Sequence, residues 1–300
     1  MGAYGFPREG AYGYARPTSV EEAVSVLASA AEAGQRTQML AGGTDVLVQM
    51  RSVDREPRTL VDVKHIAETN RVEIGADDVF VGAAVPSGVL NENAELKAIF
   101  PGLLESADLI GSTQIQGRAS IGGNLCNSSP AGDTIPAIIA AGGMCVIAGP
   151  SGTREVACED FLTGVGTNVL GDTEFLLGMR FPRPPARSGD AYLRFIPRTE
   201  MDIAVAGAGV ALSLDESGTC VHARVAIGAV APTALLVPAA GAALIGTQVD
   251  DAALAAAGAA CSDAASPITD KRGTVEYRRK VVGVLCRRAG AIARDRARGN

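Results

Sequence analysis

The apolar and polar positions near the start of the chain predict one clear helix, followed at once by a short strand. From Val20 to Ala31 the aliphatic residues recur at three- and four-residue spacing, which is typical of a helix with one buried face. Thr18 or Ser19 stands three residues before an acidic side chain, as in a capping box, and Gly34 is a typical helix stop. Residues 37–40 are predicted to form a strand that runs directly into a glycine turn.

Short strands and helices alternate over the rest of the first 183 residues. A hairpin is expected from 71–74 and 79–82, and Pro101 interrupts an otherwise helical pattern over 96–110. Residues 111–133 are rich in Gly, Ser and Asn and lack periodicity, so they predict a long loop, which in a compact domain is usually functional. The other elements expected here are strands at 60–63, 144–148 and 174–181 and a helix at 135–141.

A proline-rich segment predicts the boundary between two domains. Pro182, Pro184 and Pro185 end the last of these strands, and the segment continues to about Asp190. A chain of 300 residues is long enough for two domains of ordinary size. The fold class is α+β. Beyond the boundary we expect strands at 192–197, 203–214 and 221–230, a turn at 215–218, and helices at 252–261 and 275–297.

Composition adds an excess of glycine and a shortage of aromatic rings. Gly accounts for 36 residues, the aromatic share is 4% and Trp is absent, although 47% of the residues are hydrophobic. The glycines show no three-residue period, which excludes collagen. The core must then be built from small aliphatic side chains, with a backbone that turns sharply or approaches something closely at many places.

Charge excludes one broad class of partner. A net charge of −6 argues against a general nucleic-acid binder, which would be basic. The segment 271–300 nevertheless holds ten Lys/Arg and only two Asp/Glu. This basic segment is either a solvated helix face or a docking surface for an acidic partner.

Other signals concern location and metals. No apolar run approaches the length of a membrane span, and the first ten residues show neither a signal peptide nor, with Phe6, a myristoylation motif. The six cysteines are scattered without a C-x-x-C pair, so we expect reduced thiols in a cytoplasmic protein. His65 and His222 have no motif partners and are expected to be ordinary, partly exposed residues, and no metal site is expected on this chain.

Two glycine turns are the strongest candidates for chemistry. The first, Ala41-Gly42-Gly43-Thr44-Asp45, follows a predicted strand, and the second, Ser120-Ile121-Gly122-Gly123-Asn124, lies in the predicted loop. Paired glycines let main-chain N–H groups converge on an anion, and Thr44, Ser120 and Asn124 add side-chain donors. Together the turns could hold a pyrophosphate without a Lys or Arg, although each alone could be only a tight turn. The chain has no G-x-G-x-x-G, P-loop or nucleophile-elbow motif.

Three runs of sequence carry a resemblance to a known family. They are AGGTDVLVQMR (41–51), QIQGRASIGGNLCNSSPAGD (114–133) and RTEMDIAVAGAGVAL (198–212). These runs resemble the FAD-binding medium subunit of molybdenum hydroxylases, the carbon monoxide dehydrogenase and xanthine dehydrogenase family. EYRRKVVGVLCRRA (276–289) also resembles the close of that family's C-terminal domain. The resemblance covers nearly the whole chain in the expected order, and the two glycine motifs in one chain make it specific.

The resemblance implies an α+β fold with two domains. Residues 1–183 would form a two-subdomain FAD-binding module of the vanillyl-alcohol-oxidase or PCMH type, with two α/β subdomains. Residues 190–300 would form a smaller α+β domain with a three-stranded antiparallel sheet and helices.

The resemblance also implies roles for single positions in binding FAD. The two glycine turns match the pyrophosphate-binding segments, and the three residues before the first turn match the approach to the cofactor. Further matches are an acidic residue that hydrogen-bonds the FAD, two apolar positions in the flavin pocket and an aromatic residue near the flavin ring. No catalytic residue is expected on this chain. The residues of the turns are Ala41, Gly42, Gly43, Thr44 and Asp45, and Ser120, Ile121, Gly122, Gly123 and Asn124, and those of the approach are Gln38, Met39 and Leu40. The acidic residue is Asp133, the apolar positions are Ile110 and Leu177, and the aromatic residue is Tyr192.

Two positions near these motifs leave a choice. The family often has Lys close to Ile196, which is apolar here, so Arg194 or Arg198 is a candidate substitute near the flavin. Cys126, just after the second turn, is either a small buried thiol or, as in some flavoproteins of this fold, a point of covalent attachment. We expect the thiol and non-covalent FAD.

By resemblance, the chain is an electron-transfer subunit rather than the site of hydroxylation. A large partner would carry the molybdenum cofactor and a small partner two 2Fe–2S clusters, in a dimer of heterotrimers (a heterohexamer). FAD would accept electrons from the clusters and pass them to an external acceptor. The substrate of the complex (carbon monoxide, a purine or an N-heterocycle) and the acceptor stay open. No cysteine-bearing insert of the 4-hydroxybenzoyl-CoA reductase branch lies between Val63 and Val79.

Two alternative functions remain at this point. One is a self-contained FAD-dependent oxidase or reductase of the same fold, which would need its own substrate pocket and base. The other is a non-catalytic assembly subunit that has lost FAD. The intact glycine turns and Asp133 argue against the second.

Overall fold

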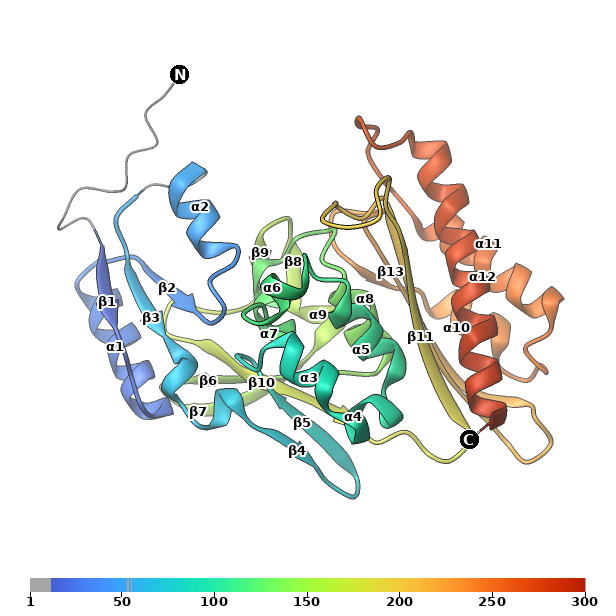
Figure 1. Cartoon of the computed structure of the whole chain (residues 1–300), viewed down its shortest axis with the longest axis horizontal. Helices are drawn as coiled ribbons and strands as arrows, with labels where there is room; N and C mark the ends of the chain where they lie inside the picture. The colour runs from blue at the N-terminus through green and yellow to red at the C-terminus, as the bar shows by residue number, and fades with distance from the viewer. Residues whose placement is uncertain (1–11, 53, 55, 300) are drawn as a thin grey trace.

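The computed structural model describes residues 12–52, 54 and 56–299, in a larger N-terminal part and a smaller C-terminal part that lie side by side (Figure 1). The expectations about a signal peptide and myristoylation fall on residues outside this range. Within the range, no helix is long and apolar enough to cross a bilayer. All six cysteines are free, as the scattered spacing predicts.

A small parallel sheet opens the N-terminal part. Its central strand β3 pairs in parallel with β1 and β2, and helix α1 buries Ala23 and Leu27 in one apolar cluster with Val61. The helix begins as predicted, because the Ser19 hydroxyl accepts from the Glu22 N–H at 3.1 Å. Helix α2, which the sequence pattern did not predict, follows the first glycine turn. The bounds are β1 Gly13–Ala15, α1 Val20–Glu32, β2 Thr37–Leu40, α2 Val46–Ser52 and β3 Thr59–Asp62, with short 3-10 turns at Val63–His65 and Glu68–Asn70.

The second subdomain is built on an antiparallel five-stranded sheet in the order β4-β5-β10-β6-β7. The predicted hairpin is β4 and β5, paired from Val72 opposite Val81. The five strands of the sheet are β4 Val72–Ile74, β5 Asp78–Gly82, β6 Met144–Gly149, β7 Gly152–Ala157 and β10 Phe175–Pro182, and β8 Leu162–Gly164 pairs separately with β9 Thr167–Asn168. The helices of this subdomain are α3 Ser87–Glu92, α4 Ala94–Ile99, α5 Pro101–Asp108, α6 Thr113–Gln116, α7 Ile121–Asn127, α8 Thr134–Ala140 and α9 Cys158–Phe161.

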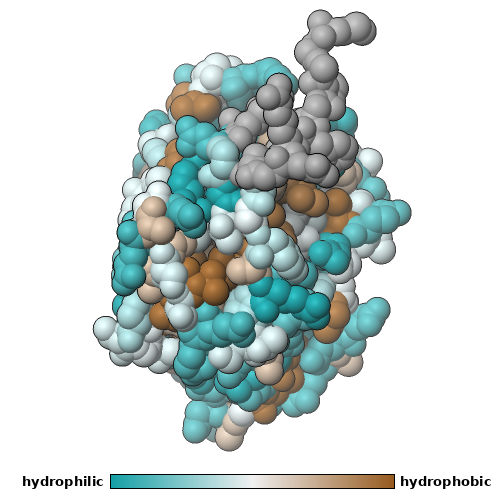
Figure 2. All heavy atoms as spheres, turned by 90° about the vertical axis from the view of Figure 1, so that its left-hand side faces the viewer, coloured by the Kyte–Doolittle hydropathy of each residue, from teal (hydrophilic) through white to brown (hydrophobic). Residues whose placement is uncertain are grey.

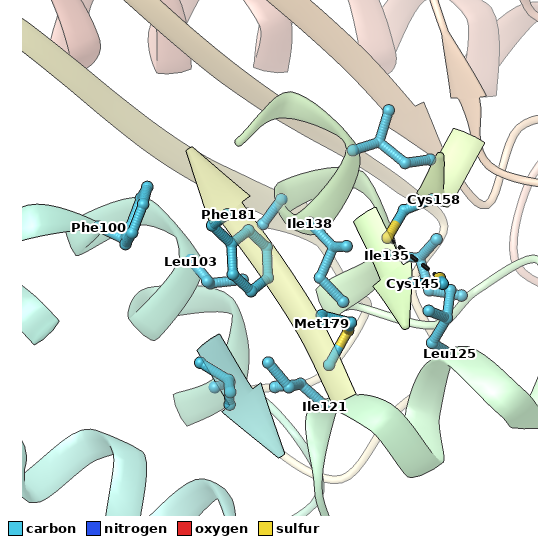
Figure 3. Packing of buried hydrophobic residues seen from close by; sticks show 14 of the residues in the cluster. Phe100, Leu103, Ile121, Leu125, Ile135, Ile138, Cys145, Cys158, Met179 and Phe181 are labelled. Carbon is cyan, nitrogen blue, oxygen red and sulfur yellow. Dashed lines mark hydrogen bonds between the residues drawn. The ribbon is translucent and has the colours of Figure 1, made fainter. Parts of the chain in front are cut away.

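The main apolar core lies between this sheet and its helices, and Figure 3 shows its centre. Phe100 from the α4–α5 junction meets Phe181 of β10 with ring centroids 5.7 Å apart. The sulfur atoms of Cys145 and Cys158 lie 3.3 Å apart in the same core. Small and medium side chains fill the remaining space, in keeping with the low aromatic content.

The prediction of a long loop over 111–133 is wrong in part, because this segment contains helices α6 and α7. The second glycine turn is the first turn of α7 rather than an irregular loop. Ser120 caps this helix, Ile121 and Leu125 bury its inner face, and Ser128 ends it in the left-handed conformation with φ of 51°. The glycines between these positions hide the helical period from a pattern of apolar residues.

The C-terminal part is a four-stranded antiparallel sheet in the order β11-β12-β13-β14, covered on one face by helices. The expectation of three strands is therefore wrong by one, because the sheet also contains β14, a strand of only two residues. The sheet also begins earlier than predicted, at Ser188 within the proline-rich boundary. The bounds are β11 Ser188–Phe195, β12 Ala206–Leu214, β13 Cys220–Gly228, β14 Leu235–Leu236, α10 Pro238–Leu244, α11 Asp251–Ala264 and α12 Val275–Gly299.

Helix α8 of the N-terminal part packs against the other face of this sheet. Glycines on the strands make room for it: a Cβ on Gly209 would lie 2.7 Å from the Pro136 carbonyl oxygen, and a Cβ on Gly228 would lie 2.6 Å from the Pro136 ring. Ion pairs flank the contact, joining Arg194 to Asp133 and Arg296 to Glu105. Part of the glycine excess therefore serves the approach of one domain to the other.

Candidate cofactor site

A cleft of about 380 Å³ opens between the two subdomains of the N-terminal part, and both glycine turns line it. Figure 2 views the molecule from the side that carries β1 and α1, and shows hydrophobic residues among hydrophilic ones on that face. Among the described residues, the lining includes no Lys or Arg, and Asp45 is its one acidic residue. Desolvation raises the pKa of the Asp45 carboxyl above its ordinary value.

The first glycine turn packs directly on the chain that leads into the second. A Cβ on Gly42 would overlap the backbone carbonyl of Arg118, two residues before Ser120. Gly43 has a φ of +77°, a conformation that favours glycine. The two sequence motifs, almost eighty residues apart, therefore meet because one has no side chain at the contact.

The two glycines of the second turn have different surroundings. A Cβ on Gly122 would lie 2.6 Å from the Cα of Ala83, so backbone closes that side. A Cβ on Gly123 would meet only the Ser120 hydroxyl, at 3.1 Å, which itself accepts from the Gly123 N–H at 3.0 Å. Gly122 is thus required for packing, whereas Gly123 leaves room in the cleft.

Main-chain donors are concentrated at the two turns. Within the described part of the chain, the N–H groups of residues 42–45 and of Gly122 donate to no protein acceptor. Backbone N–H groups away from bulk water need an acceptor. A doubly anionic group such as a pyrophosphate fits this donor set, because neutral N–H groups can hold it without a cationic side chain.

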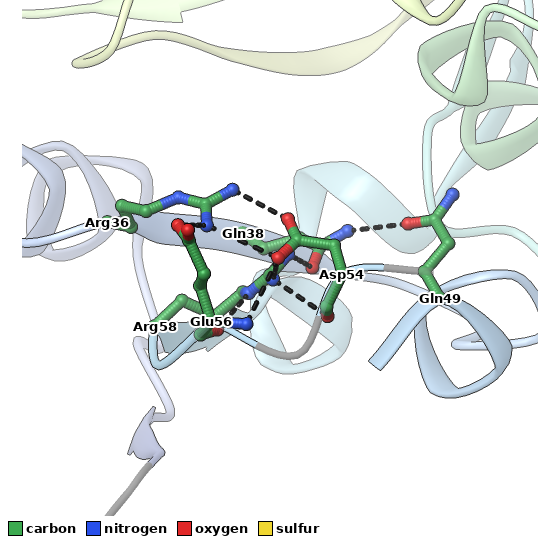
Figure 4. Close-up of polar contacts among 6 residues, drawn as sticks. All are labelled: Arg36, Gln38, Gln49, Asp54, Glu56 and Arg58. Atoms are coloured by element: carbon green, nitrogen blue, oxygen red, sulfur yellow. Dashed lines mark hydrogen bonds and ion pairs between the residues drawn. The ribbon is translucent and has the colours of Figure 1, made fainter. Parts of the chain in front are cut away.

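A chain of polar side chains crosses the cleft. Arg58 donates to the Gln38 side-chain oxygen at 3.0 Å, Gln38 donates to Gln49 at 3.1 Å, and Gln49 donates to Asn127 at 2.8 Å. Figure 4 shows its first three members together with Asp54, which pairs with Arg58 at 2.6 Å. The Arg36 guanidinium, with Arg58 beside it, holds the pKa of Asp54 well below its usual range. The chain ties β2 and α2 to α7 across the opening.

Two family descriptions match the sequence of this chain. "FAD binding domain in molybdopterin dehydrogenase" matches residues 10–184, which is more than half of it. The chain belongs to this family. "CO dehydrogenase flavoprotein C-terminal domain" matches residues 191–292, the part that follows. The flavoprotein subunits of this family carry FAD, and the cleft lies within the FAD-binding domain.

Individual relatives match over about three quarters of the chain or close to its full length. The carbon monoxide dehydrogenase medium chain of Afipia carboxidovorans is 34% identical over 96% of this chain and 99% of its own. A putative xanthine dehydrogenase FAD-binding subunit of Escherichia coli is 31% identical over 73% of this chain and 74% of its own. The reconstituted CO dehydrogenase from Oligotropha carboxidovorans superposes with a TM-score of 0.90 at 33% identity, covering 96% and 99% of the two chains.

Most of the residues that the resemblance assigns to FAD line the cleft of this family member. Five others lie elsewhere. Leu40 packs beneath Gly43, Ile121 and Leu177 are buried in apolar clusters, and Asp133 and Tyr192 lie at the domain interface. The residues that line the cleft are Gln38, Met39, Ala41, Gly42, Gly43, Thr44, Asp45, Ile110, Ser120, Gly122, Gly123 and Asn124.

Asp133 and Tyr192 belong to a buried polar cluster with Arg194. Arg194 pairs with the Asp133 carboxylate at 2.5 Å, and the Tyr192 hydroxyl donates to the same carboxylate at 3.2 Å. Burial raises the pKa of Asp133 to about 6 in spite of Arg194. Arg198, the other candidate for the family Lys, is exposed and pairs with Asp202. Neither arginine lines the cleft, and Arg194 already has a carboxylate partner.

Several lining residues carry no signal in the sequence. The resemblance assigns no role to Gln49 and Asn127, which lie within its runs, or to Asn168, which lies outside them, and only the fold brings the three side chains to the cleft. Asn168, for example, donates to the Cys126 carbonyl oxygen at 3.1 Å, across 42 residues of sequence. Cys126 lines the cleft, and burial raises the pKa of its thiol to about 12. Such a thiol is a poor nucleophile at neutral pH.

The His, Cys, Asp and Glu side chains of the described residues form no cluster that could hold a metal ion. His65 and His222 are exposed, and His65 contacts Arg16 at 3.2 Å. Over residues 12–52, 54 and 56–299, no three His, Cys, Asp or Glu side chains gather as metal ligands would.

Proposed function

We propose that this chain is the FAD-carrying, electron-transfer subunit of a molybdenum-containing hydroxylase or dehydrogenase complex. The observation that carries the proposal is the meeting of two glycine turns at one cleft, with unused N–H donors and no basic side chain from the described residues. Relatives named as dehydrogenase medium chains and FAD-binding subunits support it.

The roles of this chain's residues are to bind and position the cofactor. The turns at 41–45 and 120–124 hold the pyrophosphate, and apolar residues such as Ile110 and Leu176 contact the ring system. A bound FAD supplies chemistry in which single electrons enter and pairs leave. FAD is held non-covalently, because the thiol of Cys126 stays protonated at neutral pH.

The proposed partners follow from the family of the chain and from relatives named as medium chains. A large subunit with the molybdenum cofactor would act on the substrate, and a small subunit with 2Fe–2S clusters would pass electrons to this chain. We place two copies of each in a dimer of heterotrimers, with an external acceptor receiving the electrons. A cleft lined by one carboxyl and one high-pKa thiol offers no obvious general base, which disfavours a self-contained oxidase.

The experiment compares the isolated chain with its complex. The chain is co-expressed with the subunits that co-purify with it, and flavin absorbance is followed after mixing with candidate substrates under anaerobic conditions. Bleaching is expected only in the complex. Bleaching of the isolated chain by an organic substrate would instead identify a self-contained enzyme, and a complex with no FAD would identify an assembly subunit.

A further inference from the structure

A second cavity lies at the domain interface, apart from the cofactor cleft. Its volume is about 540 Å³, and it shares no lining residue with the cleft. Its walls come from the α4–α5 junction, the end of α8, the segment 182–185 and residues of strands β11, β12 and β13. None of the residues assigned to FAD reaches it.

Small residues keep this interdomain cavity open. Ala141, Gly142, Gly189 and Ala211 line it at positions where longer side chains would fill the space. A Cβ on Gly142 would come no closer than 3.5 Å to the Pro182 ring and 3.9 Å to Arg224 Nε. Protein interiors are otherwise close-packed, and a large concave site with a few polar groups is the usual form of a ligand pocket.

The walls are mostly flat and apolar. Phe100 contributes an aromatic ring, and Pro182, Pro184 and Pro185 contribute rigid rings from the linker. On the side of the C-terminal sheet, the apolar residue that faces the N-terminal part is Ala211 of β12. Facing apolar surfaces of this kind favour a planar ring system over a flexible or strongly hydrated ligand.

Cationic and donor groups line the cavity as well. Among the described residues, Arg183 and His222 form no ion pair, and Arg183 uses one nitrogen for the Gly75 carbonyl oxygen at 2.9 Å. Its other N–H groups are left for a ligand. Arg224 is already held by Glu159 at 2.7 Å and by the Ile139 carbonyl oxygen at 3.0 Å. The unpaired positive charge therefore resides on Arg183.

The one acidic residue in the lining serves the fold. An Asp190 carboxylate oxygen accepts from the Leu103 N–H at 3.1 Å, at the start of α5. The other oxygen is buried without a partner, and burial raises the pKa of this carboxyl to about 6. Because Asp190 is directed to the helix terminus, it does not pair with Arg183.

We propose that the interdomain cavity binds a small planar aromatic molecule that carries one anionic group. The ring lies against the linker prolines, and the anionic group contacts Arg183 and His222. Such a ligand contacts both domains at once, so its binding stabilises their docking. The site is separate from the cofactor cleft, and the proposal does not rest on the function of the cleft.

The test is calorimetric titration of the FAD-containing complex with naphthalene-2-sulfonate and with its neutral analogue, naphthalene-2-sulfonamide. We expect one sulfonate per chain and at least tenfold weaker binding of the sulfonamide. The substitution Arg183→Gln should weaken sulfonate binding about tenfold, which corresponds to about 1.4 kcal/mol, and leave the sulfonamide unchanged. Arg180→Gln is the matched control, because Arg180 lies on β10 outside the cavity and pairs with Asp78.

A second variant separates the cavity from the surface charge. Ala211→Phe places a ring in the space and should abolish binding of both probes, with an unchanged FAD content as the check that the chain folds. No sulfonate binding at concentrations up to about 1 mM would overturn the proposal. Equal affinity for the two probes, or equal affinity of the wild type and Arg183→Gln, would overturn it as well.

Discussion

At the residue scale, neighbouring glycines in one turn have separate causes. Gly122 is pressed against the Ala83 backbone, so any side chain there would disturb the fold. Gly123 has only the Ser120 hydroxyl near the position of a Cβ, so a side chain there would project where the cofactor is expected. The sequence shows two equivalent glycines, and only the packing distinguishes them.

A substitution at Gly123 should therefore damage FAD binding more than it damages the fold. We expect Gly123→Val to weaken FAD retention by at least about tenfold while the thermal midpoint of the FAD-free chain changes little. Flavin fluorescence after dialysis and a melting curve give the two quantities. Gly117→Ala is the control, since Gly117 is exposed with φ of −63° outside the cleft. Full FAD retention by Gly123→Val would contradict the site.

Asp190 makes a residue-scale prediction about pH. Burial raises its pKa to about 6, above the value in an unfolded chain, so the folded state holds the proton more tightly. Its stabilising contribution is complete below about pH 4 and is lost as the pH rises through about 6. Asp190→Asn keeps an acceptor for the Leu103 N–H but cannot titrate.

The measurement is the free energy of unfolding in urea between pH 4 and pH 7. In the wild type, this carboxyl should lower stability over that interval by on the order of 2 kcal/mol. Asp190→Asn should remove that part of the slope, and the exposed Asp263→Asn should not. An unchanged slope in Asp190→Asn would show that this carboxyl is not the group responsible.

At the element scale, helix ends decide where sequence reasoning succeeds. Helix α1 has a visible cap and a regular apolar face, so its start at Val20 is predicted correctly. Helix α7 has the same kind of cap at Ser120, but its two glycines interrupt the apolar period and make it resemble a loop. Strand β14 has two residues, too few for any alternation, and pairs only because β13 lies beside it.

The cap of α1 gives a prediction at this scale. Ser19→Ala removes the acceptor for the Glu22 N–H and should lower the free energy of unfolding by about 1 kcal/mol. Ser25→Ala, on the exposed middle of the same helix, should be neutral or slightly stabilising because alanine has the higher helix propensity. Urea titrations of both variants at one pH provide the comparison. Equal effects of the two substitutions would contradict the capping role.

At the scale of the whole molecule, the contact of α8 with the C-terminal sheet joins the cofactor domain to the rest. The second glycine turn leads through α7 to Asp133, the residue immediately before α8. Asp133 pairs with Arg194 of β11. Gly209 and Gly228 let α8 approach the sheet closely. The position of the cofactor loop is thereby tied to the docking of the two domains.

Gly209→Ala tests this docking contact. Its Cβ would lie 2.7 Å from the Pro136 backbone oxygen, so α8 or β12 must shift, and we expect a loss of on the order of 1–3 kcal/mol in unfolding free energy. Urea unfolding of the FAD-free chain measures this loss, with Gly117→Ala as the glycine-to-alanine control. A wild-type midpoint would mean that the glycine is not needed for docking.

The sequence predicts the parts of the candidate site that have a local motif, but not the contacts between residues far apart in the chain. The two glycine turns carry local signals, so their meeting at one cleft is expected from the motifs. The hydrogen bonds that link Gln38, Gln49 and Asn127 join residues far apart in sequence, so they appear only in the fold. Asp133 matches a family position, but its contacts with Arg194 and Tyr192 become visible only in the fold.

The central claim is that this chain carries FAD, and the most direct measurement is the cofactor content of the purified protein. The chain is purified with its co-purifying subunits, denatured by heat or acid, and the released flavin is separated and quantified against the amount of chain. Close to one FAD per chain, released without proteolysis, is the predicted result. A colourless preparation with no releasable FAD, or flavin that stays bound to the denatured chain, would contradict the account.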